Sequence, residues 1–343
     1  MPSVLESLNS SLHQAFLDSN EVYLLGEDIL DPYGGAFKVS RGLSTQFPDR
    51  VLTTPISEAG FVGIAAGMAM RGLRPVVELM FGDFVTLIAD QIVNHIAKFH
   101  WMYNDQVKLP MVIRTPMGGR RGYGPTHSQT IEKFYLGVPG IRVVAPVALC
   151  QMDASGSPGD LLYRSILHND DPLLFIENKL QYLLPVENQE DLKDFSITSH
   201  PNNTGLRFPT YSLSIRGAPP AVLTIAAYGY MADLAKQAVL RLAIEHEIFT
   251  ELVIPTELSP FETEQIKASA GQTGALLTIE EGTLSLGWGA EVLARVVETP
   301  GLQQIIYKRL AAREVPVPAS NVLEQQVLPG VDQIIQSAVH MLK

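Results

Sequence analysis

Two residues in the first half of the chain have the side-chain type and the surroundings of acid–base groups. The first is Glu58, which follows Pro55 and Ser57 and precedes a run of small and apolar residues typical of a helix. Ser57 is the expected N-cap, so Glu58 falls in the first turn, where it could simply complement the helix dipole. Its neighbours Ile56 and Phe61 favour a chemical role, because a carboxyl group with few polar partners is partly desolvated and suited to proton exchange near neutral pH.

The second is His127, which lies in the glycine-dense segment Met117–Gln129 (MGGRRGYGPTHSQ). This segment follows a predicted strand, Met111–Thr115, and open α/β sheets bind ligands at the carboxyl ends of their strands. Glycines let a backbone approach a ligand closely, and imidazole titrates near physiological pH. A solvated surface loop with an incidental histidine is the alternative. Long loops in compact domains are more often functional, so we expect His127 to be catalytic.

Three further side chains could contact a flat ring or relay a proton. Phe84 could stack on a ring, although an aromatic residue at the start of a helix is usually part of a core. Glu27 and Asp90 lie beside apolar runs, and each taken alone would be a solvated edge residue or a cap. The predicted turn Tyr33–Phe37 contacts a ligand only if the fold brings it near Glu58.

Common nucleotide, nucleophile and metal motifs are missing from the sequence. There is no GxGxxG after the first predicted strand and no GxxxxGK[ST], which removes support for the usual phosphate-binding loops. There is no GxSxG, HExxH or paired CxxC, so a serine-hydrolase elbow or a zinc site has no support either.

The candidate residues are expected to be positioned by strands that alternate with helices. In the first half the predicted strands are Val22–Leu25, Arg74–Met80, Met111–Thr115, Arg142–Ala145 and Leu173–Glu177. The predicted helices are Val4–Asp18, Glu58–Arg71 and Phe84–Trp101. Such alternation implies parallel pairing with right-handed crossovers.

The alternation stops at residues 189–220 and then resumes. This segment is polar and rich in Pro, Asn and Gly, which predicts a linker, with a short paired stretch around Tyr211–Ile215. Strands are then expected at Ala221–Tyr228, Phe249–Ile254, Ala275–Ile279 and Gln304–Arg309, and helices at Ala232–Glu245, Phe261–Ala270, Gly287–Val297 and Val331–Met341. We therefore predict an α/β fold of two domains, 1–188 and 221–343, each a mostly parallel sheet flanked by helices.

The composition excludes several classes of protein. Hydrophobic residues make up 46% and charged residues 18% of the 343, which is ordinary for a globular chain and argues against disorder. The formal charge of −11 disfavours non-specific binding to nucleic acid or to anionic membranes. With one cysteine, Cys150, no secretory signal and no apolar run long enough to span a bilayer, we expect a soluble cytoplasmic protein.

Several segments in the right order resemble one known family over nearly the whole chain. They are Leu24–Asp28, Tyr33–Leu43, Thr54–Gly63, Gly72–Glu78, Asp90–Asn94, Arg114–Gln129, Pro139–Pro146, Pro172–Asn178, Ala227–Gly229, Glu280–Gly282 and Val315–Pro318. Together they resemble the β subunit of the decarboxylating component of 2-oxo acid dehydrogenase complexes. This resemblance implies a transketolase-like pyrimidine-binding domain followed by a transketolase C-terminal domain.

The resemblance also implies roles for the candidate residues. Glu58 matches the family glutamate that hydrogen-bonds the aminopyrimidine ring of thiamine diphosphate and so activates the cofactor. Phe84 matches the aromatic residue packed on that ring, and His127 matches the histidine that assists acyl transfer to lipoyl. Glu27 and Asp90 fall where the family has buried acids between active sites, which implies a proton relay.

By the same resemblance, the chain carries only half of an active site. It lacks the GDG…Asn pattern of the Mg²⁺–diphosphate site, which the α subunit supplies in this family. An α2β2 heterotetramer is therefore implied, together with a lipoyl acyltransferase core and a small 2-oxo acid as substrate. The substrate is pyruvate or a branched-chain 2-oxo acid, and Ile176–Leu180 favours the pyruvate type.

Three segments depart from the family pattern. Residues 147–164 form a longer segment than usual, and Thr283 and Leu284 stand where a Trp-Pro pair is frequent. The second of these departures could alter the contact with the acyltransferase core. The family's potassium loop would fall at Met111, Ile166, Leu167, Asn169 and Asp171. Asp and Asn are exchanged there relative to the common pattern, which argues against K⁺ binding.

Two other functions remain open at this point. The chain could be the β-type half of an acetoin-cleaving or biosynthetic ketol-transferring enzyme, in which His127 handles protons without lipoyl. It could also be a non-catalytic assembly subunit, although the presence of both Glu58 and His127 argues against that.

Overall fold

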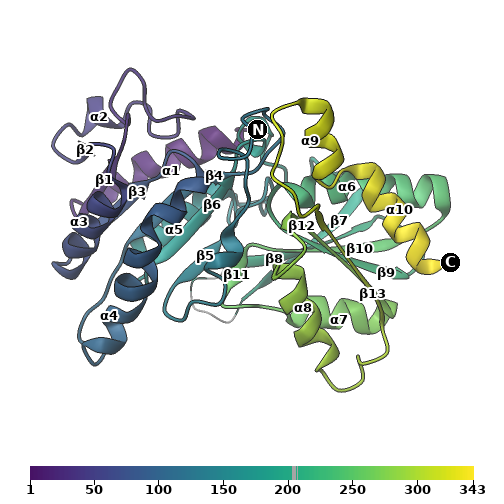
Figure 1. Ribbon diagram of the computed structural model, residues 1–343. Helices are drawn as coiled ribbons and strands as arrows, with labels where there is room; N and C mark the ends of the chain where they lie inside the picture. The colour runs from purple at the N-terminus through teal and green to yellow at the C-terminus, as the bar shows by residue number, and fades with distance from the viewer. Residues whose placement is uncertain (203–205, 207) are drawn as a thin grey trace.

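The first half of the chain forms a seven-stranded sheet in the computed structural model, which describes residues 1–202, 206 and 208–343 (Figure 1). Its strands are β1 (Val22–Gly26), β2 (Val51–Thr53), β3 (Arg74–Glu78), β4 (Val112–Met117), β5 (Arg142–Val144), β6 (Leu173–Asn178) and β11 (Glu257–Ser259). Six of them are parallel in the order β5-β6-β4-β3-β1-β2. The seventh, β11, comes from the second half of the chain and pairs antiparallel with β5 at the edge.

The second half forms a six-stranded sheet of its own. Its strands are β7 (Phe195–Pro201), β8 (Pro209–Ile215), β9 (Leu223–Ala227), β10 (Thr250–Pro255), β12 (Ala275–Thr283) and β13 (Ile306–Ala312). The order is β13-β12-β9-β10-β8-β7, in which the first four strands are parallel and the last two antiparallel. The predicted class, α/β with two mostly parallel sheets, is confirmed.

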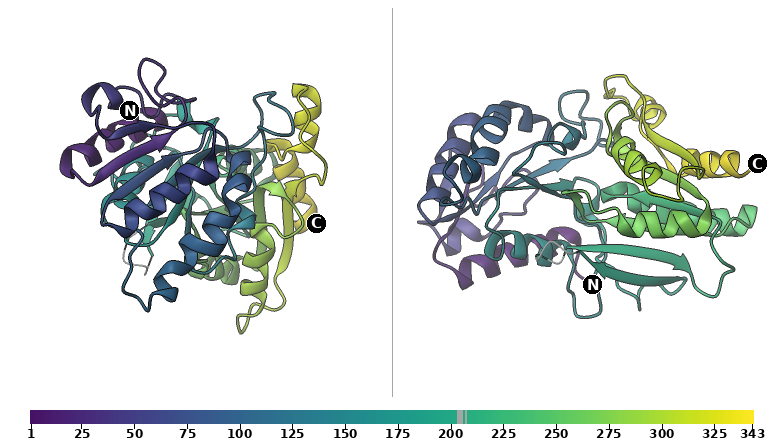
Figure 2. Two further views of the ribbon diagram at one scale, coloured as in Figure 1. Left: turned by 60° about the vertical axis from the view of Figure 1, so that its left-hand side comes forward. Right: turned by 90° about the horizontal axis from the view of Figure 1, so that it is seen from below.

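Helices cover both faces of each sheet (Figure 2). They are α1 (Val4–Asp18), α2 (Leu43–Gln46), α3 (Glu58–Met70), α4 (Ala97–Met102), α5 (Pro158–Leu167), α6 (Gly229–His246), α7 (Glu264–Thr273), α8 (Trp288–Val297), α9 (Asn321–Val327) and α10 (Val331–Leu342). Shorter turns are η1 (Gly82–Ile88), η2 (Gln91–Ile96), η3 (Glu132–Phe134) and η4 (Gln181–Leu183). Helix α1 begins with a capping box, in which Ser3 accepts from the Glu6 amide and Glu6 accepts from the Ser3 amide.

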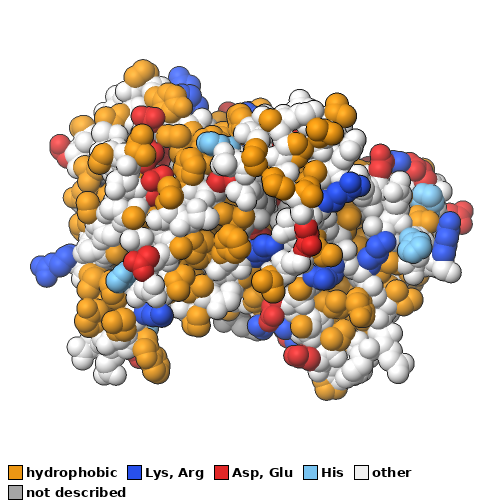
Figure 3. All heavy atoms as spheres, in the orientation of Figure 1, with side chains coloured by type: hydrophobic (Ala, Val, Ile, Leu, Met, Phe, Trp, Pro, Cys, Tyr) orange, Lys and Arg blue, Asp and Glu red, His pale blue; other side chains and the backbone are white. Residues whose placement is uncertain are grey.

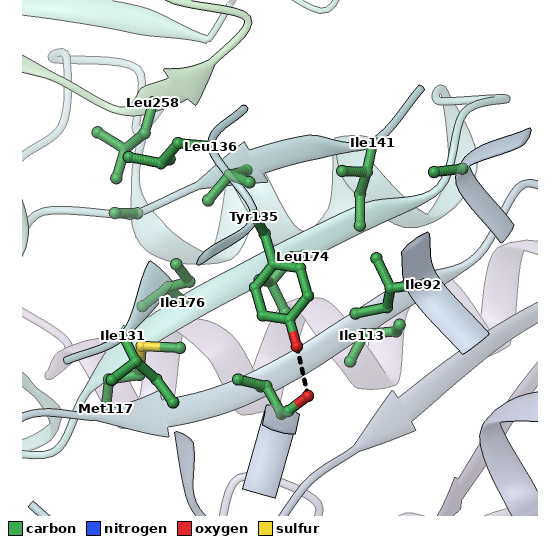
Figure 4. Close-up of a cluster of buried hydrophobic side chains, with 14 of the residues drawn as sticks. Ile92, Ile113, Met117, Ile131, Tyr135, Leu136, Ile141, Leu174, Ile176 and Leu258 are labelled. Atoms are coloured by element: carbon green, nitrogen blue, oxygen red, sulfur yellow. Dashed lines mark hydrogen bonds between the residues drawn. The ribbon is translucent and has the colours of Figure 1, made fainter. Parts of the chain in front are cut away.

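One hydrophobic cluster runs from the α3 face of the first sheet to the α7–α8 face of the second. Figure 4 shows part of it, with Leu136 of the first half beside Leu258 of β11, and Ile141 and Leu174 of the first half in the same cluster. Because β11 belongs by sequence to the second half, its side chains join the two halves through a shared core. The two sheets therefore hold a fixed relation, on which any site between them depends.

The segment predicted as a linker is part of the second sheet. Strands β7 and β8 both lie within residues 189–220, and β8 pairs with β10 (Figure 2). The paired stretch expected near Tyr211–Ile215 is confirmed as part of β8, whereas residues 203–205 and 207 lie outside the described residues. Pro and Asn suggested a free connection here, but an edge hairpin tolerates them because its outer strand needs fewer ladder hydrogen bonds.

The region predicted as one helix, Phe84–Trp101, is helical throughout, but the type of helix changes along it, from a 3₁₀ segment (η1) to a π-helical turn (η2) and then to α4. The Tyr135 hydroxyl donates a hydrogen bond to the Val85 carbonyl at 2.5 Å, so this carbonyl in η1 is bound from outside the helix (Figure 4). Gly82 also packs closely on Met117, since a Cβ at Gly82 would lie 2.3 Å from the Met117 Cγ. Contacts with other parts of the chain thus change the type of helix from the regular α-helix that the spacing of the apolar residues predicts.

Charged side chains are scattered over the surface and do not form a single patch on the face shown in Figure 3. On the face seen in Figure 3, acidic and basic side chains are interspersed, and hydrophobic side chains reach the surface of both lobes. Within the described ranges, no helix has the length and apolar character needed to cross a membrane.

Candidate active site

The predicted site residues lie at the carboxyl edge of the first sheet. Glu27 follows β1, Glu58 follows β2, Phe84 follows β3 and His127 follows β4. These four parallel strands are neighbours in the sheet, so the segments after them meet along one edge. Asp90 also follows β3, but farther along the chain.

Glu58 and Glu27 form a close pair of acids at this edge. Glu58 is the first residue of α3 and only 7% exposed, and Ser57 occupies the N-cap position without a side-chain cap bond. Burial raises the pKa of Glu27, and the Glu58 carboxylate raises it further. The Oε1 of Glu27 is buried and has no hydrogen-bond partner among the described residues, although the Ser57 amide hydrogen-bonds the Glu27 carboxylate. The pair therefore offers an acceptor that the chain itself leaves open.

Aromatic rings line the neighbouring part of the edge. The imidazole of His127 stands edge-on to Phe81 and Phe84, with ring centroids 4.7 and 5.4 Å apart. Phe84 belongs to η1, which packs against α3 and so lies close to the helix that begins with Glu58. Phe81 was missed from the sequence, where it was one more apolar residue after β3. The structure thus brings Phe84 and His127 together, with Glu58 on the adjacent helix.

The turn predicted at Tyr33–Phe37 also lies at this edge. Gly35 has φ +79° and sits against Glu78, since a Cβ there would lie 2.1 Å from the Glu78 Oε1. The ring of Phe37 contacts that of Phe81 at 5.7 Å. The turn is therefore part of the same wall, and glycine at position 35 is required for its close approach.

A buried charge cluster lies beneath the edge. Arg114 of β4 donates to Glu177 through Nε at 2.8 Å and through a second nitrogen at 2.5 Å, and it also pairs with Glu78. The Tyr182 hydroxyl donates to Glu177 at 2.5 Å. Burial raises the pKa of Glu78, and the Arg114 charge opposes this. The sequence signal for this cluster was a charged residue inside each of three apolar strands.

The segment that carries His127, residues 118–129, is called here the histidine loop. At its end, Gln129 donates to the buried Asp83 at 2.7 Å. Lys179, which follows β6, is buried and donates to the His127 carbonyl at 2.6 Å. Burial lowers the pKa of Lys179 to about 8, against the raising effect of the Asp83 charge. Neither Asp83 nor Lys179 was predicted as a site residue from the sequence.

Comparison with known proteins identifies the family of this chain. Residues 2–183 match the family described as "Transketolase, pyrimidine binding domain", and residues 219–334 match "Transketolase, C-terminal domain". Relatives include the mitochondrial pyruvate dehydrogenase E1 component subunit beta-2 of Oryza sativa subsp. japonica, 36% identical over 98% of this chain and 85% of its own length. The corresponding subunit of Bos taurus is 34% identical over 97% of this chain and 88% of its own. This chain belongs to the E1 β-subunit family of the 2-oxo acid dehydrogenases.

A solved structure supports the fold of this E1 β-family chain. It is described as "Split gene transketolase, inactive beta4 tetramer" and covers 100% of this chain and 99% of its own. The TM-score is 0.74 at 19% identity, which shows a shared fold.

Membership of the E1 β family implies that thiamine diphosphate takes part in the reaction. The residues present fit its aminopyrimidine ring. The Glu58 carboxyl would share a proton with a ring nitrogen, the open Oε1 of Glu27 would accept from an amino group, and Phe84 offers an aromatic face at the same sheet edge. In the described part of the chain, no group of three or more acids, histidines or cysteines could hold a metal ion.

Two other expectations from the E1 β resemblance find less support in this chain. Asp90 is exposed, and its side chain pairs with Asn94 at 2.7 Å and with His95 at 3.4 Å. The hydrogen bond from Asn94 lowers the pKa of Asp90. A role in proton relay for Asp90 stays a prediction.

The carbonyl oxygens of the segment that corresponds to the family's potassium loop accept hydrogen bonds from other groups of this chain. Arg74 donates to the carbonyl oxygens of Ile166 and Asn169, each at 2.9 Å. The Asn169 side chain donates to the Asp171 carbonyl at 2.5 Å, and Met111 accepts from the Leu173 amide. Leu167 ends α5 beside this group. These hydrogen bonds add no support for a potassium site, and potassium is left out of the proposed function.

Buried glutamates also meet where the two sheets adjoin. Glu132 of η3 accepts from the Tyr228 hydroxyl, and Glu280 of β12 accepts from the Gly289 amide at 3.1 Å. One oxygen of each has no partner among the residues described. Burial raises the pKa of Glu280 to about 8, and the negative charge of Glu132 adds to this. Glu280 is therefore protonated at neutral pH and charged in alkaline solution.

Glu280→Gln is expected to raise the free energy of unfolding by about 4 to 5 kcal/mol at pH 9 and by less than about 1 kcal/mol at pH 5. An unfolded glutamate loses its proton near the model value of 4.5, whereas folded Glu280 keeps it up to about 8. Wild-type stability therefore falls as pH rises through this window, and glutamine cannot ionise. Urea unfolding between pH 5 and 9 measures the effect, with the exposed Glu298→Gln as control. Parallel wild-type and variant curves would contradict it.

Proposed function

We propose that this chain is the β half of a thiamine-diphosphate-dependent 2-oxo acid dehydrogenase. It decarboxylates a small 2-oxo acid oxidatively and passes the acyl group to lipoyl, together with an α subunit. The observation that carries this proposal is the open acid pair Glu58–Glu27 beside Phe84 and His127 at one sheet edge. When bound, thiamine diphosphate supplies a carbon nucleophile and an electron sink for decarboxylation.

The chain's own residues would each perform one task. The protonated Glu58 carboxyl would donate a hydrogen bond to a nitrogen of the pyrimidine ring and share its proton with that nitrogen. Phe84 packs on the ring, and the Phe81 and Phe37 rings exclude water from that wall. His127 contacts the rings of Phe81 and Phe84, and it would transfer protons during acyl transfer.

The proposed partner is an α subunit that supplies the Mg²⁺–diphosphate site, in an α2β2 heterotetramer docked on a lipoyl acyltransferase core. Support comes from the outer face of α3, whose Ile64 is 62% exposed, and from Ile56 just before this helix, which is 86% exposed. A Cβ at Gly63 or Gly67 on the same helix would meet open space. An apolar face of small residues next to Glu58 suits burial by another subunit.

The proposed substrate is pyruvate, with a branched-chain 2-oxo acid as the alternative. The relatives are named as pyruvate dehydrogenase subunits, and Ile176–Leu180 favours the same type. We also propose a cytoplasmic location, because Cys150 is the single cysteine and lies buried as a free thiol. The relatives reported above are named as mitochondrial proteins.

The test is an assay of this chain co-expressed with its α-type partner. With thiamine diphosphate and Mg²⁺, we expect pyruvate-dependent release of CO₂ and acylation of lipoyl domains. A branched-chain 2-oxo acid is assayed in parallel, and an aldehyde acceptor tests ketol transfer. Turnover with the aldehyde acceptor alone would replace the proposal with the second enzyme function, and a complex without turnover would indicate an assembly subunit.

His127→Ala in this complex is expected to lower lipoyl acylation about a hundredfold while changing decarboxylation with an artificial electron acceptor less than about fivefold. Removing the imidazole takes away the proton-transferring group, whereas the Glu58–Phe84 contacts remain. The two assays on one preparation give the ratio. The exposed His246→Ala is the control, and equal losses in both assays would contradict the assigned role.

A further inference from the structure

The histidine loop is held by carboxylates that come from the second half of the chain. Glu281 of β12 accepts from the Gly119 amide at 2.8 Å. Glu324 of α9 accepts from the Arg120 amide at 2.6 Å and from the Gly122 amide at 3.3 Å. Both carboxylates are buried, at 5% and 1% exposure. Glu281 also accepts from the side-chain amide of Asn178 at 3.0 Å. Since a buried carboxylate needs donors, the loop amides stabilise both glutamates, and they are the donors found for Glu324 among the described residues.

The glycines of the loop make this contact possible. A Cβ at Gly119 would lie 2.5 Å from the Leu328 Cδ1 and 3.0 Å from the Glu324 Oε1. Gly122 has φ +69°, and a Cβ there would lie 3.1 Å from the Asn321 Oδ1. The glycine density that first drew attention to the loop is therefore required by its approach to α9.

The loop is also strained at the point where it is held. Arg120 has φ +66°, a left-handed conformation that a side chain disfavours. Its amide is bound by Glu324, and its guanidinium donates to the Pro329 carbonyl after α9. At the other end of the loop, Lys179 donates to the His127 carbonyl. The histidine therefore lies on a loop held at both ends.

We propose that Glu281 and Glu324 are positioning residues that fix where His127 lies, so that the second domain sets the acyl-transfer geometry of the first. The part that concerns acyl transfer rests on the function proposed above for His127, whereas the part that concerns the loop does not. Loss of either carboxylate releases the loop while the Glu58 side of the site stays intact.

The test is limited trypsin digestion of the co-expressed complex that carries Glu324→Gln or Glu281→Gln. Arg120 and Arg121 lie within the loop, so its release opens a cleavage point at the loop itself. We expect cleavage there to be about tenfold faster, as for the loss of a hydrogen bond to a charged acceptor. Gly119→Ala disturbs the contact between the loop and α9 from the loop side, and it should speed cleavage to a similar degree. Glu314→Gln is the matched control, because Glu314 accepts from a backbone amide outside the loop, that of Ser285.

Activity then separates the two parts of the proposal. In the variants we expect lipoyl acylation to fall about tenfold, with little change in KM or in decarboxylation with an artificial acceptor. Unchanged cleavage in all three variants, with the thermal midpoint of the wild type, would overturn the inference whatever the activity. Faster cleavage with normal acylation would overturn the positioning role. A wild-type complex that never acylates lipoyl would instead count against the proposed function.

Discussion

Glu58→Gln is expected to lower kcat for decarboxylation about a thousandfold in the reconstituted complex, with a much smaller change in KM for the 2-oxo acid. Glutamine keeps the size of the side chain and part of its hydrogen-bonding capacity, but it cannot hold or release a proton. Among the described residues, the acid that interacts with Glu58 is Glu27 after β1, and burial raises the pKa of Glu27. Glu27 is therefore poorly suited to carry the charge in place of Glu58.

Steady-state decarboxylation with an artificial electron acceptor measures this loss, and cofactor titration shows whether binding survives. The control is Glu21→Gln, an exposed glutamate just before β1. A loss of less than about tenfold in the Glu58 variant would remove the main support for the proposed function. It would favour a non-catalytic assembly role.

Arg114→Met is expected to lower the free energy of unfolding by about 3 to 5 kcal/mol. Arg114 is the only positive partner found for Glu78 and Glu177 among the described residues, and all three side chains are buried. Methionine fills much of the same volume but leaves two uncompensated carboxylates. Protonation removes their charge, so the deficit should shrink at acidic pH.

Urea unfolding of the wild type and the variant at pH 5 and pH 8 measures both effects. The matched control is Arg295→Met, which breaks a half-exposed pair with Glu291 and should cost less than about 1 kcal/mol. A variant as stable as the wild type at pH 8 would show that the cluster is not ionised as described.

The alternating pattern of apolar segments predicted most of the fold. Helices α1, α3, α6, α8 and α10 lie within a few residues of the predicted ranges, because each has a long amphipathic or small-residue pattern. Helices α5 and α9 were missed. Helix α5 starts with Ser157 as N-cap and Pro158 in the first turn, a signal that was present in a segment considered only for its length.

The site was predictable where one segment carries its own signal, and not where the contact is long-range. Glu58, Phe84 and His127 stand beside distinctive neighbours, and the structure places all three at one edge. The partners of the histidine loop come from far away. Glu281 lies 162 residues from Gly119, and Glu324 lies 204 residues from Arg120. No local pattern in a single sequence reports such contacts.

The position of strand β11 determines where a chain of this family can be divided into two pieces. It completes the first sheet with residues from the second half, and the paired strands β7 and β8 lie in the segment where a linker was expected. If the chain were cut after residue 188, the first piece would expose the edge of β5 and the apolar residues that Leu258 covers. A chimaera of two relatives would therefore need β11 and the first sheet to come from the same parent.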